Sequence, residues 1–230
     1  MLILIMIISV SYAGDYGVHR PENYNLNTDN DERILFILDF SNSMNESIHG
    51  ERKVDMMLYT MSKIVQNLNK NVSVGLRVYG HKMSFTPIEA CRASSLIVPI
   101  TTGADIMSSL SKVKARGMTP ITFSLKQAVK YDFMGFRGKK HIILLTDGGE
   151  NCDESPCKYA MELVQLRKDI FIDVIAFNIS DEDDLSQLEC AALVTSGKFY
   201  TANTAAELLK SLNNSVSGKK EVEAKIISNY

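Results

Sequence analysis

The chain has 230 residues, of which 45% are hydrophobic and 23% charged, and its formal net charge is -2. This length and apolar content allow one substantial hydrophobic core, which favours one globular domain. The small negative charge, without a block of basic residues, gives no electrostatic reason to expect binding to nucleic acid or to an anionic membrane.

The amino-terminal segment, residues 1–13, is typical of a secretory signal peptide. An apolar run from Leu2 to Val10 precedes Ser11-Tyr12-Ala13, which has small residues where a signal peptidase reads them, so cleavage is expected before Gly14. The run is shorter than the roughly 20 apolar residues of a membrane-spanning helix, and no membrane span is expected after cleavage. A buried strand is the alternative interpretation of the run.

Residues 14–31 are rich in Asn, Asp, Gly and Tyr and have no periodicity, which predicts a flexible lead-in and a folded domain that starts at Glu32. From there, short aliphatic and β-branched runs alternate with segments of helical period. An amphipathic helix is predicted from Val54 to Leu68, and Met161 to Leu166 carry a shorter apolar stripe. Strands are predicted over residues 33–38, 73–79, 94–100, 141–146, 171–177 and 198–201.

The connections between these strands predict how they pair. His81 to Arg92 joins the second and third strands without a helical pattern, so this pair is expected to be antiparallel at one sheet edge. The other connections need crossover helices and imply parallel strands. The predicted fold class is therefore α/β, a doubly wound (Rossmann-like), mostly parallel six-stranded sheet with one antiparallel edge strand and helices on both faces.

Oxygen-bearing side chains follow two of the predicted strands. Asp39, Ser41 and Ser43 come at alternate positions after the first strand, and Asp147 follows the fourth, while Thr119 precedes a helical run. Because parallel strands end at a common edge, we expect these groups to converge there. Carboxylates and hydroxyls are an adequate shell for Mg²⁺. If the hydroxyls coordinate directly and the carboxylates partly through water, the ion is underneutralised and would accept a carboxylate from a partner.

These residues carry a family resemblance. Asp39-x-Ser41-x-Ser43, Thr119 and Thr146-Asp147-Gly148 resemble, in order and spacing, the metal-ion-dependent adhesion site of von Willebrand factor type A (VWA) domains. The resemblance spans about residues 32 to 216 and is strongest to bacterial secreted members with four similarly placed cysteines. It implies a domain without catalytic activity that binds Mg²⁺, or Mn²⁺ or Ca²⁺, through Asp39, Ser41, Ser43, Thr119 and Asp147.

The resemblance completes the predicted organisation: a signal peptide over residues 1–13, a lead-in over 14–31, a VWA domain over 32–216 and a polar tail over 217–230. Two residues depart from the family pattern. Asn42 stands where bacterial members usually have Gly, and Asn tolerates a positive φ better than most residues. Phe40 is bulkier than is common and is expected to shape the rim of the contact surface.

The chain has four cysteines, and their even number in an exported protein favours disulfides. A zinc site is the alternative, but no CxxC pair is present. With the usual strand order 3-2-1-4-5-6, Cys91 and Cys190 lie too far apart to pair. Two arrangements remain: Cys157 with Cys190 and Cys91 with Cys152, or a local bridge between Cys152 and Cys157.

Two functions compete. The first is an exported, adhesion-type module that binds a protein partner presenting an acidic residue, either secreted or in the periplasm or cell envelope. The second is a Mg²⁺-dependent hydrolase or phosphoryl-transfer enzyme at the same site, but the chain lacks GxxxxGK[ST] and GxSxG motifs and a recognisable base for Ser41 or Ser43. The acidic loop of Glu150, Asp153 and Glu154 is interpreted as solvated; a second cation site, or repulsion of acidic partners, is the alternative.

Overall fold

The computed structural model describes residues 32–69 and 72–217. The predicted signal peptide at 1–13, the lead-in at 14–31 and all but the first residue of the predicted tail at 217–230 lie outside the described residues. Their boundaries therefore stay predictions. Within the described part of the chain, no helix has both the length and the apolar character needed to cross a membrane.

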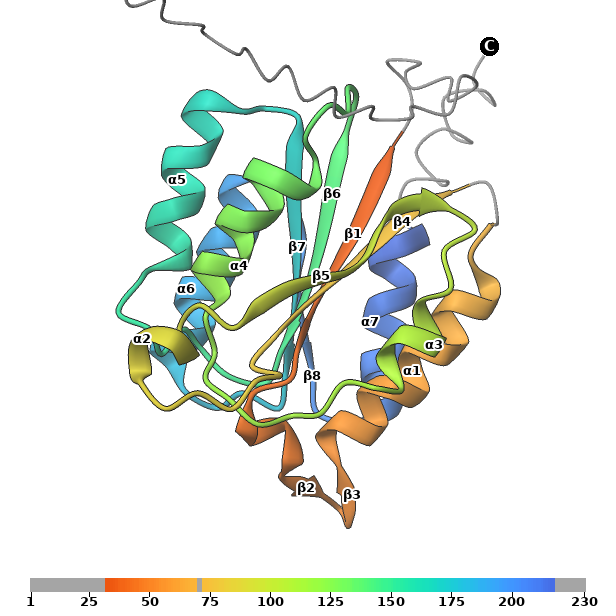
Figure 1. Cartoon of the computed structure of the whole chain (residues 1–230), viewed down its shortest axis with the longest axis vertical. Coiled ribbons are helices and arrows are strands. Elements are labelled where there is room, and N and C mark those ends of the chain that lie inside the picture. The colour runs from red at the N-terminus through yellow and green to blue at the C-terminus, as the bar shows by residue number, and fades with distance from the viewer. Residues whose placement is uncertain (1–31, 70–71, 218–230) are drawn as a thin grey trace, which may run out of the picture.

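The main sheet has six strands in the order β5-β4-β1-β6-β7-β8 (Figure 1). Only β4 and β5 pair antiparallel among these described strands, and β5 forms one edge. This confirms the predicted strand order, the antiparallel edge and the doubly wound α/β class. The strands are β1 (Arg33–Asp39), β4 (Ser73–Tyr79), β5 (Ser94–Thr102), β6 (Lys140–Thr146), β7 (Ile170–Phe177) and β8 (Phe199–Ala202).

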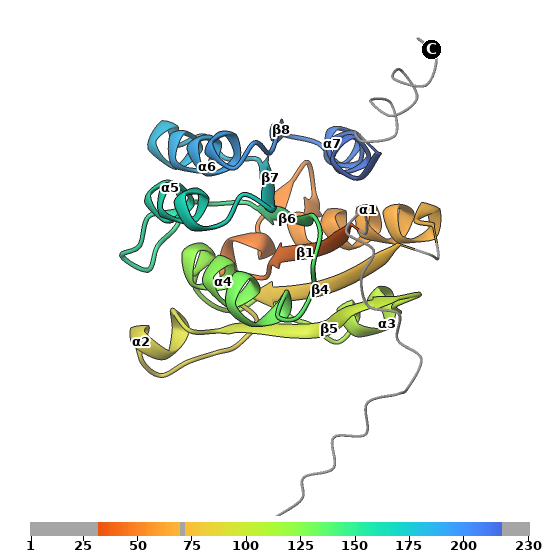
Figure 2. The ribbon, with the colours of Figure 1, turned by 90° about the horizontal axis from the view of Figure 1, so that it is seen from above.

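Helices cover both faces of the sheet, as the view along it shows (Figure 2). One face carries α1 (Lys53–Asn67), α3 (Ile106–Leu110) and α7 (Ala205–Ser217), and the other carries α4 (Ile121–Gln127), α5 (Pro156–Leu166) and α6 (Glu182–Val194). Each layer has its own apolar core. The shorter elements are η1 (Asn42–Asn45), the hairpin β2 (Ser47–Ile48) and β3 (Glu51–Arg52), α2 (Pro87–Ala90) and η2 (Ala128–Asp132).

The sequence of β1 explains its central place. Ile34, Phe36 and Leu38 pack into the core under α1 and α7, whereas Leu35 and Ile37 pack into the core under α4 and α6. Successive side chains of a strand point to opposite faces, so a strand covered on both sides must be apolar throughout. This burial fixes the end of β1, and with it Asp39, at the middle of the sheet edge.

One predicted connection differs from the structure. The segment from His81 to Arg92 was expected to have no helix, but it contains α2, a single turn whose Thr86 hydroxyl accepts a hydrogen bond of 3.2 Å from the Glu89 amide. A helix of one turn is too short to show an apolar period, so the pattern could not reveal it. The pair Thr86-Pro87 is a helix-start signal from which this turn could have been predicted.

Candidate metal centre

The predicted ligands come together at the edge where β1 and β6 end. Asp39 is the last residue of β1, and Asp147 follows β6, the parallel neighbour of β1. Gly117, just before Thr119, forms a parallel bridge with Ser41. The structure thus places the three predicted segments side by side, at the lower edge of the sheet in Figure 1.

Two serine hydroxyls converge on one carboxylate. The hydroxyl of Ser43 donates to Oδ1 of Asp147 at 2.8 Å, and that of Ser41 reaches the same oxygen at 3.4 Å. The two hydroxyl oxygens lie 2.9 Å apart. The 3₁₀ turn η1 makes this possible, because the Met44 amide donates back to the carbonyl of Ser41 at 3.2 Å and so turns Ser43 towards Asp147.

Asp39 is fully buried beside the second carboxylate. Its Oδ1 accepts from the Ser41 amide at 2.6 Å, and its Oδ2 accepts from the Thr146 hydroxyl at 2.9 Å and more weakly from the Asp147 amide at 3.4 Å. Burial, and then the charge of Asp147, raise the pKa of Asp39 to about 7, although the hydrogen bonds from Ser41 and Thr146 act in the opposite direction. The site therefore holds more negative charge than its own hydrogen bonds stabilise.

Thr119 is held by its backbone. Its amide donates to Oδ1 of Asn151 at 2.7 Å, and the helix α4 starts two residues later. Thr119 is buried and lies two residues after Gly117, which forms the bridge with Ser41. Sequence reasoning missed Asn151, and no motif would have singled it out, because its role depends on a loop that crosses back over the site.

Gly80 lets the end of β4 approach this loop closely. It has a φ of +68°, and a Cβ there would lie 2.5 Å from the backbone nitrogen of Ser41. Its carbonyl also accepts from the Gly117 amide at 2.7 Å, which ties the segment before Thr119 to the same place. Any larger side chain at position 80 would push Ser41 away from Asp147.

Lys53 is a member of the site that the sequence analysis missed. Its side chain is only 6% exposed, and its Nζ donates to Oδ2 of Asp147 at 3.0 Å and to Glu46 at 2.9 Å. Burial lowers the pKa of Lys53, but the bonds to Glu46 and Asp147 outweigh it and leave the pKa above its ordinary value. The signal was present: Lys53 lies in line with the buried stripe of α1, at helical spacing from Met57, Thr60 and Ile64.

The acidic loop after Asp147 has a structural use. The carboxylate of Glu150 accepts from the amides of Thr122 and Cys152 at 2.7 and 3.0 Å, and Glu154 pairs with Lys126. Burial raises the pKa of Glu150, and these amide bonds oppose the rise. Glu150 and Glu154 are therefore engaged by protein groups, and they do not gather with Asp153 into a site: among the described residues, no group of three or more Asp, Glu, His or Cys side chains is placed to hold an ion.

One expectation about the loop after Asp39 is wrong. Phe40 does not shape a rim, because it is fully buried in the core with Met44 and Met57. Asn42 begins the turn η1 and is absent from the positive-φ residues of the described chain, so the tolerance of Asn for a positive φ is not used there. Exposed apolar side chains are found in the β4–β5 connection, which follows Gly80. They are Met83, Phe85 and Ile88.

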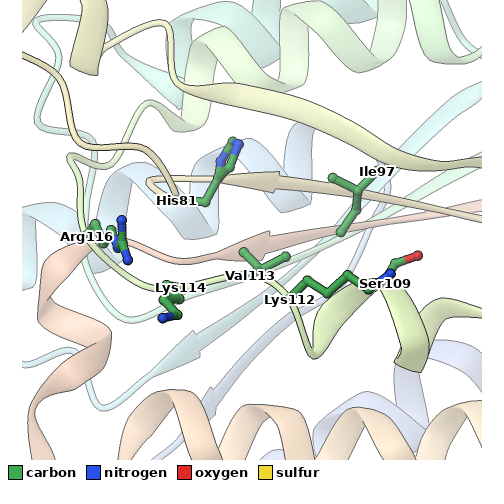
Figure 3. A pocket seen from close by; sticks show the side chains of 7 residues that line it. All are labelled: His81, Ile97, Ser109, Lys112, Val113, Lys114 and Arg116. Atoms are coloured by element: carbon green, nitrogen blue, oxygen red, sulfur yellow. The ribbon is translucent and has the colours of Figure 1, made fainter.

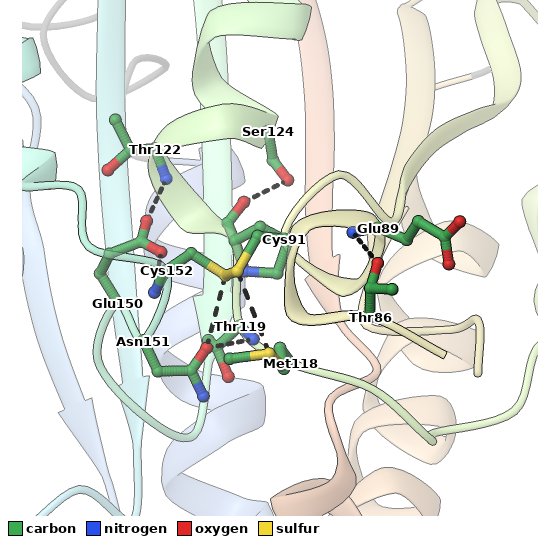
Figure 4. The surroundings of a disulfide bond; sticks show 11 residues. Thr86, Glu89, Cys91, Met118, Thr119, Thr122, Ser124, Glu150, Asn151 and Cys152 are labelled. Atoms are coloured by element: carbon green, nitrogen blue, oxygen red, sulfur yellow. Dashed lines mark hydrogen bonds between the residues drawn. A yellow bond between two sulfur atoms is a disulfide. The ribbon is translucent and has the colours of Figure 1, made fainter. Parts of the chain in front are cut away.

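Both disulfides follow the first of the two predicted arrangements. Cys91 and Cys152 are bonded with a Cα–Cα distance of 5.5 Å, and Cys157 and Cys190 with 5.2 Å. The local bridge between Cys152 and Cys157 is thus wrong. Figure 4 shows the first bond beside Met118, Thr119 and Asn151, so it ties the β4–β5 connection to the loop that holds Thr119. The second bond joins α5 to α6.

A model of the von Willebrand factor type A domain matches residues 34–215. The chain belongs to the von Willebrand factor type A family. VWA domains are generally non-enzymatic and mediate protein interactions. The chain is 29% identical over 184 residues to the uncharacterised protein YwmD of Bacillus subtilis, covering 77% of this chain and 81% of YwmD.

Solved structures share the VWA fold. The protein BatB of Bacteroides thetaiotaomicron superposes with a TM-score of 0.64 at 18% identity, covering 83% of this chain and 99% of BatB. Proximal thread matrix protein 1 of the mussel byssus, solved with a zinc-occupied MIDAS motif, superposes with a TM-score of 0.63 at 22% identity, covering 81% of this chain and 45% of its own.

The residues present fit a small divalent cation by their chemistry. All the side chains that converge on Asp147 from the Asp39 loop offer oxygen atoms, and Mg²⁺, Mn²⁺ and Ca²⁺ prefer oxygen ligands. Asp39 and Asp147 are both buried, and among the described residues the ammonium of Lys53 contacts Asp147. Burial and the charge of Asp147 both raise the pKa of Asp39, and a divalent ion would offset the repulsion between the two carboxylates.

Proposed function

We propose that this VWA domain is a non-enzymatic, adhesion-type module that binds a protein partner through a divalent cation held by Asp39, Ser41, Ser43, Thr119 and Asp147. The convergence of the Ser41 and Ser43 hydroxyls on one oxygen of Asp147 carries this proposal. A cluster of hydroxyls on a buried carboxylate, beside a second buried carboxylate, is an arrangement that a hard cation stabilises.

The burial of Asp39 and Asp147 indicates how each part of the site would act in binding. Asp39 and Asp147 are fixed by the Ser41, Thr146 and Lys53 contacts and supply negative charge without needing to move. When bound, the cation offers an open coordination position that a carboxylate of the partner can fill. Because Lys53 already offsets part of the charge of Asp147, the site leaves the cation underneutralised and favours an acidic partner residue.

Export is the proposed setting. The two disulfides, which persist in oxidising compartments, support a location outside the cytoplasm, and the predicted signal peptide at residues 1–13 agrees with it. We propose that the mature domain is secreted or acts in the periplasm or cell envelope.

Thermal unfolding tests the metal site. Mg²⁺ or Mn²⁺ is expected to raise the melting temperature of the wild type and of the control Ser47→Ala, which removes an exposed hydroxyl a few residues away. The ions are expected to leave Asp39→Ala and the double variant Ser41→Ala/Ser43→Ala unchanged. Equal shifts in all four proteins would contradict the proposed ligands. Comparing Mg²⁺, Mn²⁺, Ca²⁺ and Zn²⁺ in the same assay identifies the preferred ion.

Partner binding needs a separate measurement. Immobilised wild-type domain is expected to retain a defined protein from an extracellular or envelope fraction in Mg²⁺ and to release it in chelator. Immobilised Asp39→Ala domain serves as the control. Retention that survives both the chelator and the substitution would contradict the metal-dependent mode.

A further inference from the structure

Three cations line one side of a surface pocket near the metal centre. Lys112, Lys114 and Arg116 belong to the connection between α3 and α4, and all three are exposed. With His81, Ile97, Ser109 and Val113 they line a cavity of about 490 Å³ (Figure 3). No carboxylate is among these described lining residues. We call Lys112, Lys114 and Arg116 the cation row.

The cation row follows an extended stretch of chain. Residues 113–116 have no helical or turn structure, and Val113 and Ala115 pack against the hydrophobic core while the three cations at alternate positions are exposed. Alternate residues of an extended chain lie about 6.5 to 7 Å apart on one side. The row therefore presents positive charges at the spacing of side chains i and i+2 of an extended peptide.

These cations have no internal use. None of them takes part in an ion pair within the described part of the chain, in contrast to Lys53, Arg77, Lys126 and Lys140, which all contact carboxylates. The chain as a whole has a net charge of -2, so this local concentration of unpaired positive charge is not a consequence of composition. Unpaired cations that line a cavity without carboxylates attract an anionic ligand.

The row starts beside the metal centre. The Arg116 amide donates to the carbonyls of Phe40 and Gly80 at 3.0 and 3.1 Å, and the next residue, Gly117, bridges to Ser41. Thr119 lies three residues beyond Arg116, which is at most about 10 Å of chain. One short ligand segment can therefore reach both the metal centre and the row.

We propose that the cation row and its pocket bind an extended acidic peptide segment of the protein partner, with carboxylates at alternate positions, whose first carboxylate occupies the metal centre. This inference rests on the proposed function and specifies its partner. Ile97 and Val113 offer an apolar floor for side chains between the carboxylates.

The linear arrangement favours a peptide over a phosphate group. A single phosphate is bound best where several donors converge on its oxygens, often with a bidentate Arg. Here the charged groups are spread along a line at side-chain spacing. A polyphosphate chain has the same overall charge, and the test below separates it from a peptide.

Fluorescence anisotropy with a labelled peptide of alternating Asp and Thr, in saturating Mg²⁺, tests the proposal. The triple variant Lys112→Gln/Lys114→Gln/Arg116→Gln is expected to bind roughly tenfold more weakly than the wild type, because three exposed charge pairs are lost. The control variant Lys158→Gln/Lys168→Gln/Lys210→Gln removes the same charge from exposed positions of α5, its following loop and α7, and is expected to stay within about twofold.

Each outcome decides one proposal. Equal binding by the two triple variants, or no binding of the peptide to the wild type, overturns the cation row. Binding of polyphosphate in place of the peptide overturns it as well. Both variants are expected to keep the Mg²⁺-induced thermal shift. Loss of that shift in the wild type counts against the metal site alone, since the comparison of the two variants can be repeated in chelator.

Discussion

Asp132 and Asp39 are both buried aspartates, but their surroundings differ. Asp132, at the end of η2, receives two hydrogen bonds of 2.7 Å from the guanidinium of Arg77, a bidentate pair in the core beside β4. Asp39, at the end of β1, lies beside Asp147, and burial, followed by the charge of that neighbour, raises its pKa. The first carboxylate is neutralised by the fold itself. The second is in excess of the cations around it, which distinguishes it from the structural ion pair and agrees with the proposed metal site.

The largest expected effect concerns the neutralised pair. Arg77→Met leaves Asp132 buried without its counter-charge, which should lower the free energy of unfolding by about 3 to 5 kcal/mol. Urea unfolding in chelator and in Mg²⁺ measures it, and the loss should be the same in both. The double variant Arg77→Met/Asp132→Leu removes both charges and should recover most of the loss. A double variant as unstable as the single one would contradict this interpretation.

The second largest effect is expected for the disulfide between Cys91 and Cys152, which lies beside Thr119. Cys91→Ser/Cys152→Ser opens a link across a sequence separation of 61 residues and should lower the free energy of unfolding by about 2 to 4 kcal/mol. Because the bond holds the loop on which Asn151 positions Thr119, Mg²⁺ affinity should also fall. Calorimetric titration with Mg²⁺ measures the affinity.

The second disulfide is the matched control. Cys157→Ser/Cys190→Ser opens a separation of 33 residues between α5 and α6, away from Thr119. It should cost a similar free energy of unfolding and leave Mg²⁺ affinity unchanged. An equal loss of affinity in both variants would mean that the first bond acts only through global stability.

The sequence allowed the sheet to be predicted well, and the structure gives the physical reason. The central strands β1 and β6 are apolar runs bounded by polar residues, because both faces of the sheet are covered there, and strand order follows from which connections contain helices. Asp39 and Asp147 could be placed for the same reason: they end neighbouring strands. Their meeting depends on sheet topology alone.

What could not be predicted depends on side-chain packing between distant segments. Lys53 reaches Asp147 across 94 residues of sequence, and Asn151 reaches Thr119 across 32. The bulk of Phe40 predicts a place at the rim of the contact surface, but Phe40 lies in the core with Met44, directly before the turn η1. A pattern shows which face a residue shares with its own element, and a loop residue has no such pattern to follow.

Removing the charge of Asp39 tests the same comparison with Asp132 at the other carboxylate. Asp39→Asn removes the excess charge and keeps the shape, so the metal-free protein at pH 7.5 should gain about 1 kcal/mol in the free energy of unfolding. The same variant should lose its stabilisation by Mg²⁺. Denaturant unfolding with and without the ion measures both. Destabilisation of the metal-free protein, as expected for Arg77→Met, would remove the distinction between the two sites.

The pH dependence provides an independent control. With a folded pKa of about 7 against an ordinary value of 3.8, Asp39 holds its proton in the folded state and loses it in the unfolded state between these values. The contribution of Asp39 to the free energy of unfolding is therefore greatest at low pH and is lost as the pH rises from about 4 to about 7. Metal-free Asp39→Asn should show a flatter decline of stability over this window than the wild type.

The smallest expected effect concerns Lys53, the one buried cation at the metal centre among the described residues. Lys53→Gln removes the charge that faces Oδ2 of Asp147, so a divalent ion gains a less neutralised carboxylate. Mg²⁺ affinity should rise by about threefold, which corresponds to about 0.7 kcal/mol. Arg52→Gln is the control, because it removes the neighbouring charge from an exposed pair with Asp55, where solvent screens it. A rise in Lys53→Gln and none in Arg52→Gln would mean that the lysine and the metal ion compete for the charge of Asp147. The lysine would then set how much positive charge the centre can offer to a partner carboxylate, and unchanged affinity in Lys53→Gln would exclude that role.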